Sequence, residues 1–123
     1  MLVELEPHSD IYVLRLHGRF ATGRDSGYLL GRLDDIRNSS YSKFLADFAN
    51  VEYIDSTGLG FVVGLYTSIT KKDGGRFVLA NVGRRVREVL ELTRLAEVLP
   101  IYSSEEAALE ALRQTQKSAT THG

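Results

Sequence analysis

The first twenty residues predict two neighbouring strands. Residues 2–6 and 11–16 are rich in aliphatic side chains, and residues 7–10 (PHSD) between them have the composition of a turn. Short apolar runs separated by turn residues are typical of strands that pair with each other. We expect the second strand to end at Gly18.

Three later apolar runs predict the rest of a sheet. Residues 43–48 (KFLADF), continued loosely to residue 54, and residues 76–80 (RFVLA) have the near-continuous apolar character of buried parallel strands. Residues 97–102 are expected to form a last short strand. Pro100 favours an edge or a strand end for it, because proline has no N–H group to donate.

Four helices are predicted between and after these strands, from apolar residues at helical spacing. They cover residues 25–38, residues 61–69, a segment after residue 84, and a segment after residue 104. The side chains expected to face the core are Leu29, Leu30, Leu33 and Ile36; Val62, Val63, Tyr66 and Ile69; Val86, Val89, Leu90 and Leu92; and Ala107, Ala108, Leu109, Ala111 and Leu112.

Several residues indicate how these helices begin, end and pack. Residues 71–75 (KKDGG) predict a helix C-terminus, with cations near the negative end of the helix dipole and glycine available for a left-handed residue. Ser103 is the expected cap of the last helix, since Glu106 follows three residues later. Gly27 and Gly31 each weaken the first helix, so we expect a close packing partner there.

The order of the elements predicts one α/β domain, with a mixed and mostly parallel sheet of about four to five strands and about four helices packed on it. This domain is expected to span residues 1–113. Residues 114–123 are polar and are expected to form a flexible tail.

Composition excludes several classes of function. The 123 residues carry 15 basic and 16 acidic side chains, a formal net charge of −1, which gives no electrostatic case for nucleic acid. There is no cysteine and no apolar run of about 20 residues, so we expect a cytoplasmic protein without disulfides or membrane contact. A basic face is expected at Arg84, Arg85, Arg87 and Arg94, either solvated or, as the alternative, facing an acidic partner surface.

The three histidines give no support to a metal site. His8, His17 and His122 are not spaced by three or four residues from one another, as ligands on one helix would be. We expect His17 at the surface, and we predict no metal and no cofactor.

Residues 55–60 (DSTGLG) lie between the strand at 43–54 and the helix at 61–69. The side chains of Asp55, Ser56 and Thr57 can each accept a hydrogen bond from the first helical turn, which predicts a strand-to-helix corner. Two interpretations of residues 55–57 are possible: they form a plain helix cap, or Ser56 is a site of phosphorylation. A phosphate at a helix N-terminus is stabilised by about 0.3–1 kcal/mol, so its charge would disturb a docked partner and not the fold.

At this point the sequence resembles a known family. Residues 53–60 (YIDSTGLG), an amphipathic helix after them, Gly74 and Gly75, the strand at 76–80 and the segment 92–95 (LTRL) are similar to bacterial anti-sigma factor antagonists with a STAS domain. The similarity runs from about residue 2 to residue 112, and it implies a single STAS-like domain.

The resemblance implies a phosphorylation switch. The serine after the aspartate is the phosphoacceptor of that family, which corresponds to Ser56, with Thr57 the less favoured position. The partner implied is a serine-protein kinase that is also the anti-sigma factor, a GHKL-type ATPase, and a PP2C-type phosphatase resets the serine. The residues expected to bind the partner are Asp55, Ser56, Thr57, Gly58, Leu59 and Gly60.

The chain departs from the family at one place. Many antagonists carry a G-E-x-D pattern after the second strand, where this chain has Gly18, Arg19, Phe20 and Ala21. The arginine could favour a phosphorylated Ser56 or suit a different kinase.

Three other functions compete with the switch. Residues 58–64 (GLGFVVG) are a poor phosphate loop, because the third glycine comes one residue late for G-x-G-x-x-G. Ser56 lacks the G-x-S-x-G elbow of a serine hydrolase, so we predict no catalytic residues and no enzyme. A STAS scaffold that is never phosphorylated, in a stress-signalling or lipid-transport assembly, remains the alternative.

Overall fold

Five strands form one mixed sheet in the computed structural model, which describes residues 2–20 and 26–122. The strands lie in sequence order, β1 and β2 are antiparallel, and the three other pairs are parallel. This confirms the predicted mixed, mostly parallel sheet. The strands are β1 (Leu2–His8), β2 (Ile11–Phe20), β3 (Lys43–Ile54), β4 (Arg76–Ala80) and β5 (Ile101–Tyr102).

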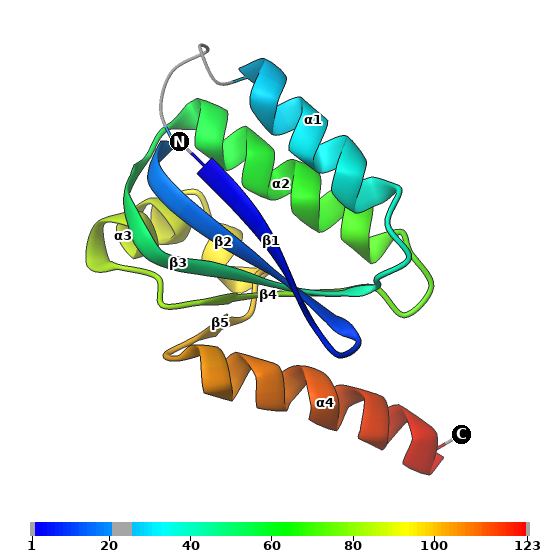
Figure 1. The fold of residues 1–123 in the computed structure, drawn as a ribbon. Helices are drawn as coiled ribbons and strands as arrows, with labels where there is room; N and C mark the ends of the chain where they lie inside the picture. Colours follow the sequence, from blue (N-terminus) through cyan, green and yellow to red (C-terminus); the bar gives the residue numbers. More distant parts are fainter. Residues whose placement is uncertain (1, 21–25, 123) are drawn as a thin grey trace.

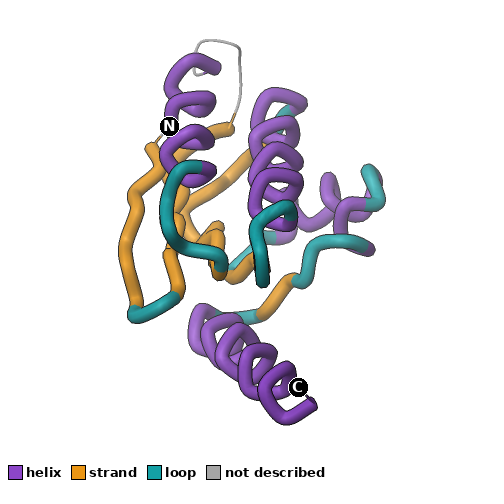
Figure 2. The backbone as a smooth tube through the Cα atoms, turned by 90° about the vertical axis from the view of Figure 1, so that its right-hand side faces the viewer, coloured by secondary structure: helices purple, strands orange, loops and turns teal. Residues whose placement is uncertain are grey.

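Helices cover both faces of the sheet (Figure 1). α1 (Ser26–Arg37), α2 (Ser56–Thr70) and α3 (Arg84–Leu92) share one core cluster with the sheet, while α4 (Glu105–His122) packs in a second cluster. Figure 2 shows α4 apart from the other helices, beyond the strands. α1 and α2 lie side by side and run in the same direction.

β3 explains why two separate cores form. Its side chains alternate, so Phe44, Ala46 and Phe48 belong to the cluster under α1, α2 and α3, whereas Leu45 belongs to the cluster under α4. A strand directs successive side chains to opposite faces of its sheet. A strand with both faces covered therefore has the continuous apolar run seen in the sequence.

The ends of several elements differ from the prediction. β2 does not end at Gly18 but continues to Phe20, with Gly18 at a φ of 94° that favours glycine. The last strand is reduced to Ile101–Tyr102, and a short 3₁₀ helix, Leu95–Glu97, takes up part of the segment before it. Pro100 lies directly before β5, as its missing N–H group suggests.

Three apolar side chains predicted to face the core are exposed instead. Leu30 is 62% exposed, Val63 40% and Leu92 85%. Leu30 and Val63 directly follow the core positions Leu29 and Val62, and Leu92 is the last residue of α3, so helical spacing alone placed all three on the wrong side of the boundary. The other predicted core residues of α1 and α2 are buried or half-buried, and Arg84, Arg85, Arg87 and Arg94 are exposed as expected.

Side chains anchor the end of α2 to the segment before β3 and cap the start of α4. Residues 71–75 end α2 as predicted, with Gly74 at a φ of 69°. The Lys72 ammonium group donates to the carbonyl oxygens of Ser39 (2.7 Å) and Tyr41 (2.8 Å), and burial lowers the pKa of Lys72. α4 is capped by Ser104 and not by Ser103, since the Ser104 hydroxyl accepts from the N–H of Ala107 at 3.1 Å.

The helix α4 continues to His122, so the backbone shows no boundary at residue 113. The flexibility predicted for residues 114–123 stays a prediction. The predicted helix start at residue 25 lies outside the described residues.

The expected close packing at Gly27 and Gly31 is wrong. A Cβ atom at either position would have no other atom within 4 Å. The tight approach between α1 and α2 lies at Gly64, where a Cβ atom would be 3.0 Å from Leu33 Cδ2. The glycine that allows close helix packing is therefore in α2 and not in α1.

Gly31→Ala is expected to stabilise the fold by about 0.5–1 kcal/mol, because alanine restricts the unfolded chain and meets no obstacle in the helix. Urea unfolding measures the change. Gly64→Ala is the matched control, and it should gain less because Leu33 must move. A destabilised Gly31→Ala variant would contradict this account.

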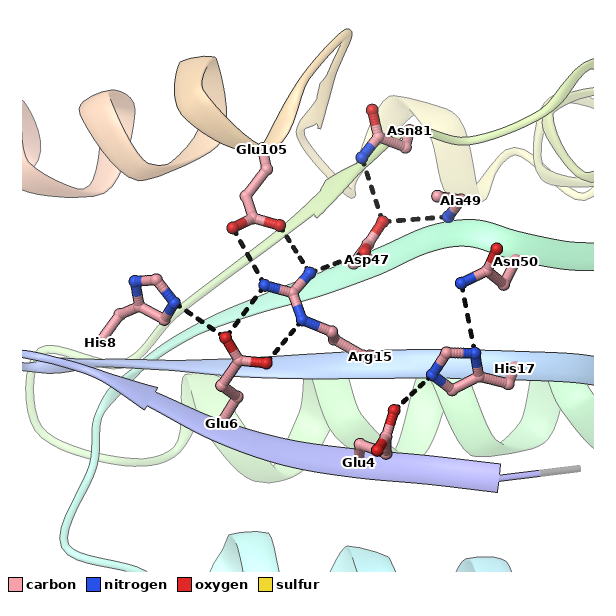
Figure 3. Close-up of polar contacts among 10 residues, drawn as sticks. All are labelled: Glu4, Glu6, His8, Arg15, His17, Asp47, Ala49, Asn50, Asn81 and Glu105. Carbon is pink, nitrogen blue, oxygen red and sulfur yellow. Dashed lines mark hydrogen bonds and ion pairs between the residues drawn. The ribbon is translucent and has the colours of Figure 1, made fainter.

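An arginine-centred cluster fastens α4 to the sheet (Figure 3). The Arg15 guanidinium donates to Glu6 on β1 (2.7 Å), to Asp47 on β3 (2.9 Å) and to Glu105 at the start of α4 (2.7 Å). The other Asp47 oxygen accepts from the Asn81 amide at 3.0 Å. One half-buried cation thus joins β1, β2, β3 and α4, and sequence reasoning did not find it.

Acid is expected to weaken this cluster. Hydrogen bonds from Arg15, and then from His8, lower the pKa of Glu6 from 4.5 to about 2. A group with a lowered folded-state pKa stabilises the fold above its unfolded value, and this stabilisation is lost as the pH falls from about 4.5 to about 2.

Thermal unfolding between pH 6 and pH 2 tests this expectation. Glu6→Gln should show a weaker pH dependence between pH 4.5 and pH 2 than the parent chain, while Glu88→Gln on α3 should keep the parent profile. Parallel profiles for Glu6→Gln and the parent chain would refute the proposed role of Glu6.

Candidate functional site

β3 passes into α2 through a single residue, Asp55. This residue is extended (φ −114°, ψ −166°), and its carboxylate oxygen Oδ1 accepts from the N–H groups of Thr57 (2.9 Å) and Gly58 (3.3 Å). Its backbone carbonyl accepts from the N–H of Leu59 at 2.8 Å. The predicted strand-to-helix corner is confirmed, but the helix begins at Ser56 and not at Phe61.

The six residues 55–60 therefore do not form one exposed loop. Ser56 and Gly60 are exposed, Thr57 and Leu59 are half-buried, and Gly58 is buried. Ser56 is the exposed first residue of α2, directly after the Asp55 cap. The binding role of all six residues stays a prediction.

The charge beside Ser56 changes the electrostatic argument made from the sequence. The Asp55 carboxylate already accepts from two of the N–H groups that a phosphate would otherwise use. It also brings a negative charge next to the serine. A phosphate on Ser56 thus gains less from the helix N-terminus than the sequence suggested.

The end of β2 lies beside this corner. In the backbone register, Arg19 is opposite Tyr53 and Phe20 is opposite Ile54. The segment that departs from the G-E-x-D pattern is therefore next to α2. The side chains of Arg19 and Phe20 and all of Ala21 lie outside the described residues, so the effect of Arg19 on Ser56 stays a prediction.

An apolar groove borders the corner. It has a volume of about 250 Å³ and runs between the N-terminal halves of α1 and α2. This groove was not expected from the sequence, because Leu30 was predicted to lie in the core. Its lining residues are Leu29, Leu30, Leu33, Thr57, Gly60 and Phe61.

The structure gives little support to a phosphate loop or to a catalytic Ser56. Residues 58–64 lie inside α2 and cannot form a phosphate loop. His8 bonds Glu6, and His17, which is half-buried at the sheet surface, bonds Glu4 and Asn50, so neither ring is directed at Ser56. The described residues contain no group of three or more side chains suited to hold a metal ion. Within the same part of the chain, no helix has the length and apolar character of a membrane span.

Comparison with known proteins decides the family. A model of the STAS domain matches residues 3–108. The chain belongs to the STAS domain family. This confirms the resemblance drawn from the sequence.

Proteins similar to this STAS protein are named as anti-sigma factor antagonists. It is 27% identical over 110 residues to the anti-sigma F factor antagonist of Paenibacillus polymyxa. This match covers 89% of this chain and 93% of that protein. A Thermotoga maritima structure described as a candidate anti-sigma factor antagonist is 28% identical, with a TM-score of 0.79 over 90% of this chain and 94% of that one.

The fold also matches the Bacillus cell fate determinant SpoIIAA. Its unphosphorylated form is 23% identical, with a TM-score of 0.75 over 92% of this chain and 97% of that one. Its phosphorylated form is 21% identical, with a TM-score of 0.67 over 89% and 99%. At these identities the likeness shows the fold.

The Asp55 cap is expected to stabilise the start of α2. Asp55→Ala should lower the free energy of unfolding by about 0.5–2 kcal/mol, because the N–H groups of Thr57 and Gly58 lose their acceptor. Asp55→Asn keeps an oxygen at the cap and should lose much less. Urea denaturation compares the two, with Ser56→Ala as an exposed control, and equal stability of Asp55→Ala and the parent would contradict the capping role.

Proposed function

We propose that this chain is an anti-sigma factor antagonist whose binding is switched at Ser56. The unphosphorylated chain binds a serine-protein kinase that is also the anti-sigma factor, a GHKL-type ATPase, and thereby releases a sigma factor in the cytoplasm. Phosphorylation of Ser56 ends this binding, and a PP2C-type phosphatase restores it. The chain itself acts by binding and not by catalysis.

The position of Ser56 carries this proposal. An exposed hydroxyl at the first residue of a capped helix is accessible to a kinase, and its backbone is held by Asp55. Thr57 is less suitable, because it is half-buried and lines the groove beside α1.

Phosphorylation would act on the partner more than on the fold. A phosphate adds about −1.5 to −2 charges at neutral pH. Burying that charge in an interface without a cation costs several kcal/mol, and about 1.4 kcal/mol corresponds to a tenfold loss of affinity. Asp55 increases the effect, since a docked partner would have to accommodate two neighbouring anionic groups.

The names of the relatives support this function. The Paenibacillus polymyxa protein is an anti-sigma F factor antagonist, and its match covers nearly the whole of both chains. SpoIIAA has been solved with and without its phosphate, which supports the view that this fold tolerates the modification.

Incubation with a GHKL-type serine kinase of the source organism and ATP tests the proposal. We expect one phosphate, mapped to Ser56 by mass spectrometry, and release of the chain from the kinase on size exclusion. Ser56→Ala should remain unmodified and stay bound in the presence of ATP.

Thr57→Ala is the matched control, and it should be phosphorylated like the parent chain. Modification confined to Thr57 would contradict the site. Binding that never responds to ATP would favour the alternative, a STAS scaffold without a switch.

A further inference from the structure

The charges of α3 are arranged against its own helix dipole. Its first turn contains Arg84, Arg85 and Arg87 and no acidic residue, and its last turn contains Glu91 and no basic residue. Cations near the positive N-terminal end and anions near the negative C-terminal end lower the stability of a helix. Gly83, before the helix, supplies no side-chain cap. Charges that disfavour their own helix indicate a role outside it.

Most of these charges have no partner within the chain. Arg84 pairs with Glu88 at 3.5 Å, and the Arg84 side chain is still 93% exposed. In the part of the chain that the structure describes, Arg85, Arg87 and Glu91 are exposed and form no ion pair. The exposed surface of α3 therefore carries charges of both signs that another molecule can pair with.

The C-terminal half of α3 borders a hollow that suits an arginine side chain. The hollow has a volume of about 390 Å³ and is lined by Glu88, Glu91 and Leu92. Leu92 is 85% exposed, and Val98, on the segment after the helix, is 49% exposed. The aliphatic stem of an arginine packs on apolar side chains, while its guanidinium pairs with carboxylates. The same helix thus has exposed arginines at one end and a complementary hollow at the other.

A second copy of the chain matches this arrangement. A two-fold symmetric interface uses the same patch on both subunits, so the patch must be complementary to itself. When two α3 helices pack antiparallel about an axis at Glu88, Arg85 of one copy lies opposite Glu91 of the other, because both are three residues from the axis. The positive end of each helix dipole then lies beside the negative end of the other. Each Glu88 at the axis keeps Arg84 of its own chain as its counter-ion.

The contact is small, which predicts a weak dimer. α3 has nine residues and is about 14 Å long, whereas a standard interface covers about 800 Å² on each partner. The 3₁₀ helix Leu95–Glu97 packs against α3 and extends the surface. Figure 2 shows α2 between α1 and α3, so this contact leaves the groove between α1 and α2 uncovered.

We propose that α3 is a self-association surface through which two copies of this chain pair antiparallel. The arginines of each copy enter the acidic hollow of the other, and Leu92 packs against the aliphatic stem of an arginine across the interface. This inference goes beyond the switch, since Ser56 lies on α2 and takes no part in the contact.

Analytical ultracentrifugation of the full chain tests the proposal, between about 10 µM and about 1 mM protein. We expect a monomer that passes into a dimer as the concentration rises. The association constant should fall several-fold when the ionic strength is raised from about 0.05 M to about 0.5 M, because salt screens exposed charges. A chain that stays monomeric throughout this range overturns the proposal.

Charge reversal tests the antiparallel arrangement. An acidic variant, Arg85→Glu with Arg87→Glu, should remain monomeric, because like charges then face each other across the axis. A basic variant, Glu88→Arg with Glu91→Arg, should remain monomeric for the same reason. Mixed in equal amounts, the two variants should form a heterodimer at least as tight as the parent dimer. A mixture that fails to associate contradicts the pairing of opposite charges.

Matched controls place changes of the same kind elsewhere on the chain. Lys71→Glu with Arg113→Glu alters the net charge as the acidic variant does, at exposed positions outside α3, and should dimerise like the parent. Leu92→Gln should weaken the dimer several-fold, whereas Leu30→Gln, at an exposed leucine of α1, should not. Equal losses in the Lys71 and Arg113 control and in the acidic variant would reveal a general effect of net charge and overturn the proposal.

Circular dichroism melting at low protein concentration separates association from folding. The acidic variant should melt above the parent chain, since glutamates at the start of α3 favour the helix dipole. A variant that is more stable and yet monomeric cannot owe its monomeric state to a damaged fold. Should the basic variant fail to fold, the acidic variant and Leu92→Gln still decide the outcome, and dimers of parent strength in both would refute the α3 contact.

Discussion

One carboxylate oxygen determines where α2 begins. Asp55 accepts from the N–H groups of both Thr57 and Gly58, so the chain passes from β3 into the helix without an intervening loop. With a longer connection, Ser56 would lie on a segment free to change its conformation. Because the cap is in place, the hydroxyl has a fixed position at the carboxyl end of the sheet, where α/β folds hold their functional residues on rigid elements.

The two faces of the sheet are stabilised differently. Under α4, Arg15 joins three carboxylates from separate elements, and the small cluster of Leu45, Ala108 and Leu112 packs beside it. On the other face, the larger core holds α1 and α2, yet their outer seam is left open as a groove. The first face is thus closed by ion pairs, whereas the second keeps an open apolar groove between its two helices.

The strands could be predicted from the sequence because their apolar runs are local, as residues 76–80 illustrate. The start of α2 was misjudged because Gly58 and Gly60 disfavour a helix, and the hydrogen bonds of Asp55 outweigh that preference. The Arg15 cluster could not be found, since Glu105 is 90 residues away along the chain. Ser56 was identified as a candidate from its neighbours alone, but its exposure and the adjoining groove depend on how α1 packs.

The exposure of Leu30 and Val63 also bears on how related chains diverge. Side chains that contribute little to the interior can be exchanged without repacking it. A duplicated gene could therefore acquire a different binding preference through a few replacements along the outer seam, with the architecture retained. Paralogous copies in one genome could coexist in this way as separate signalling lines built on the same scaffold.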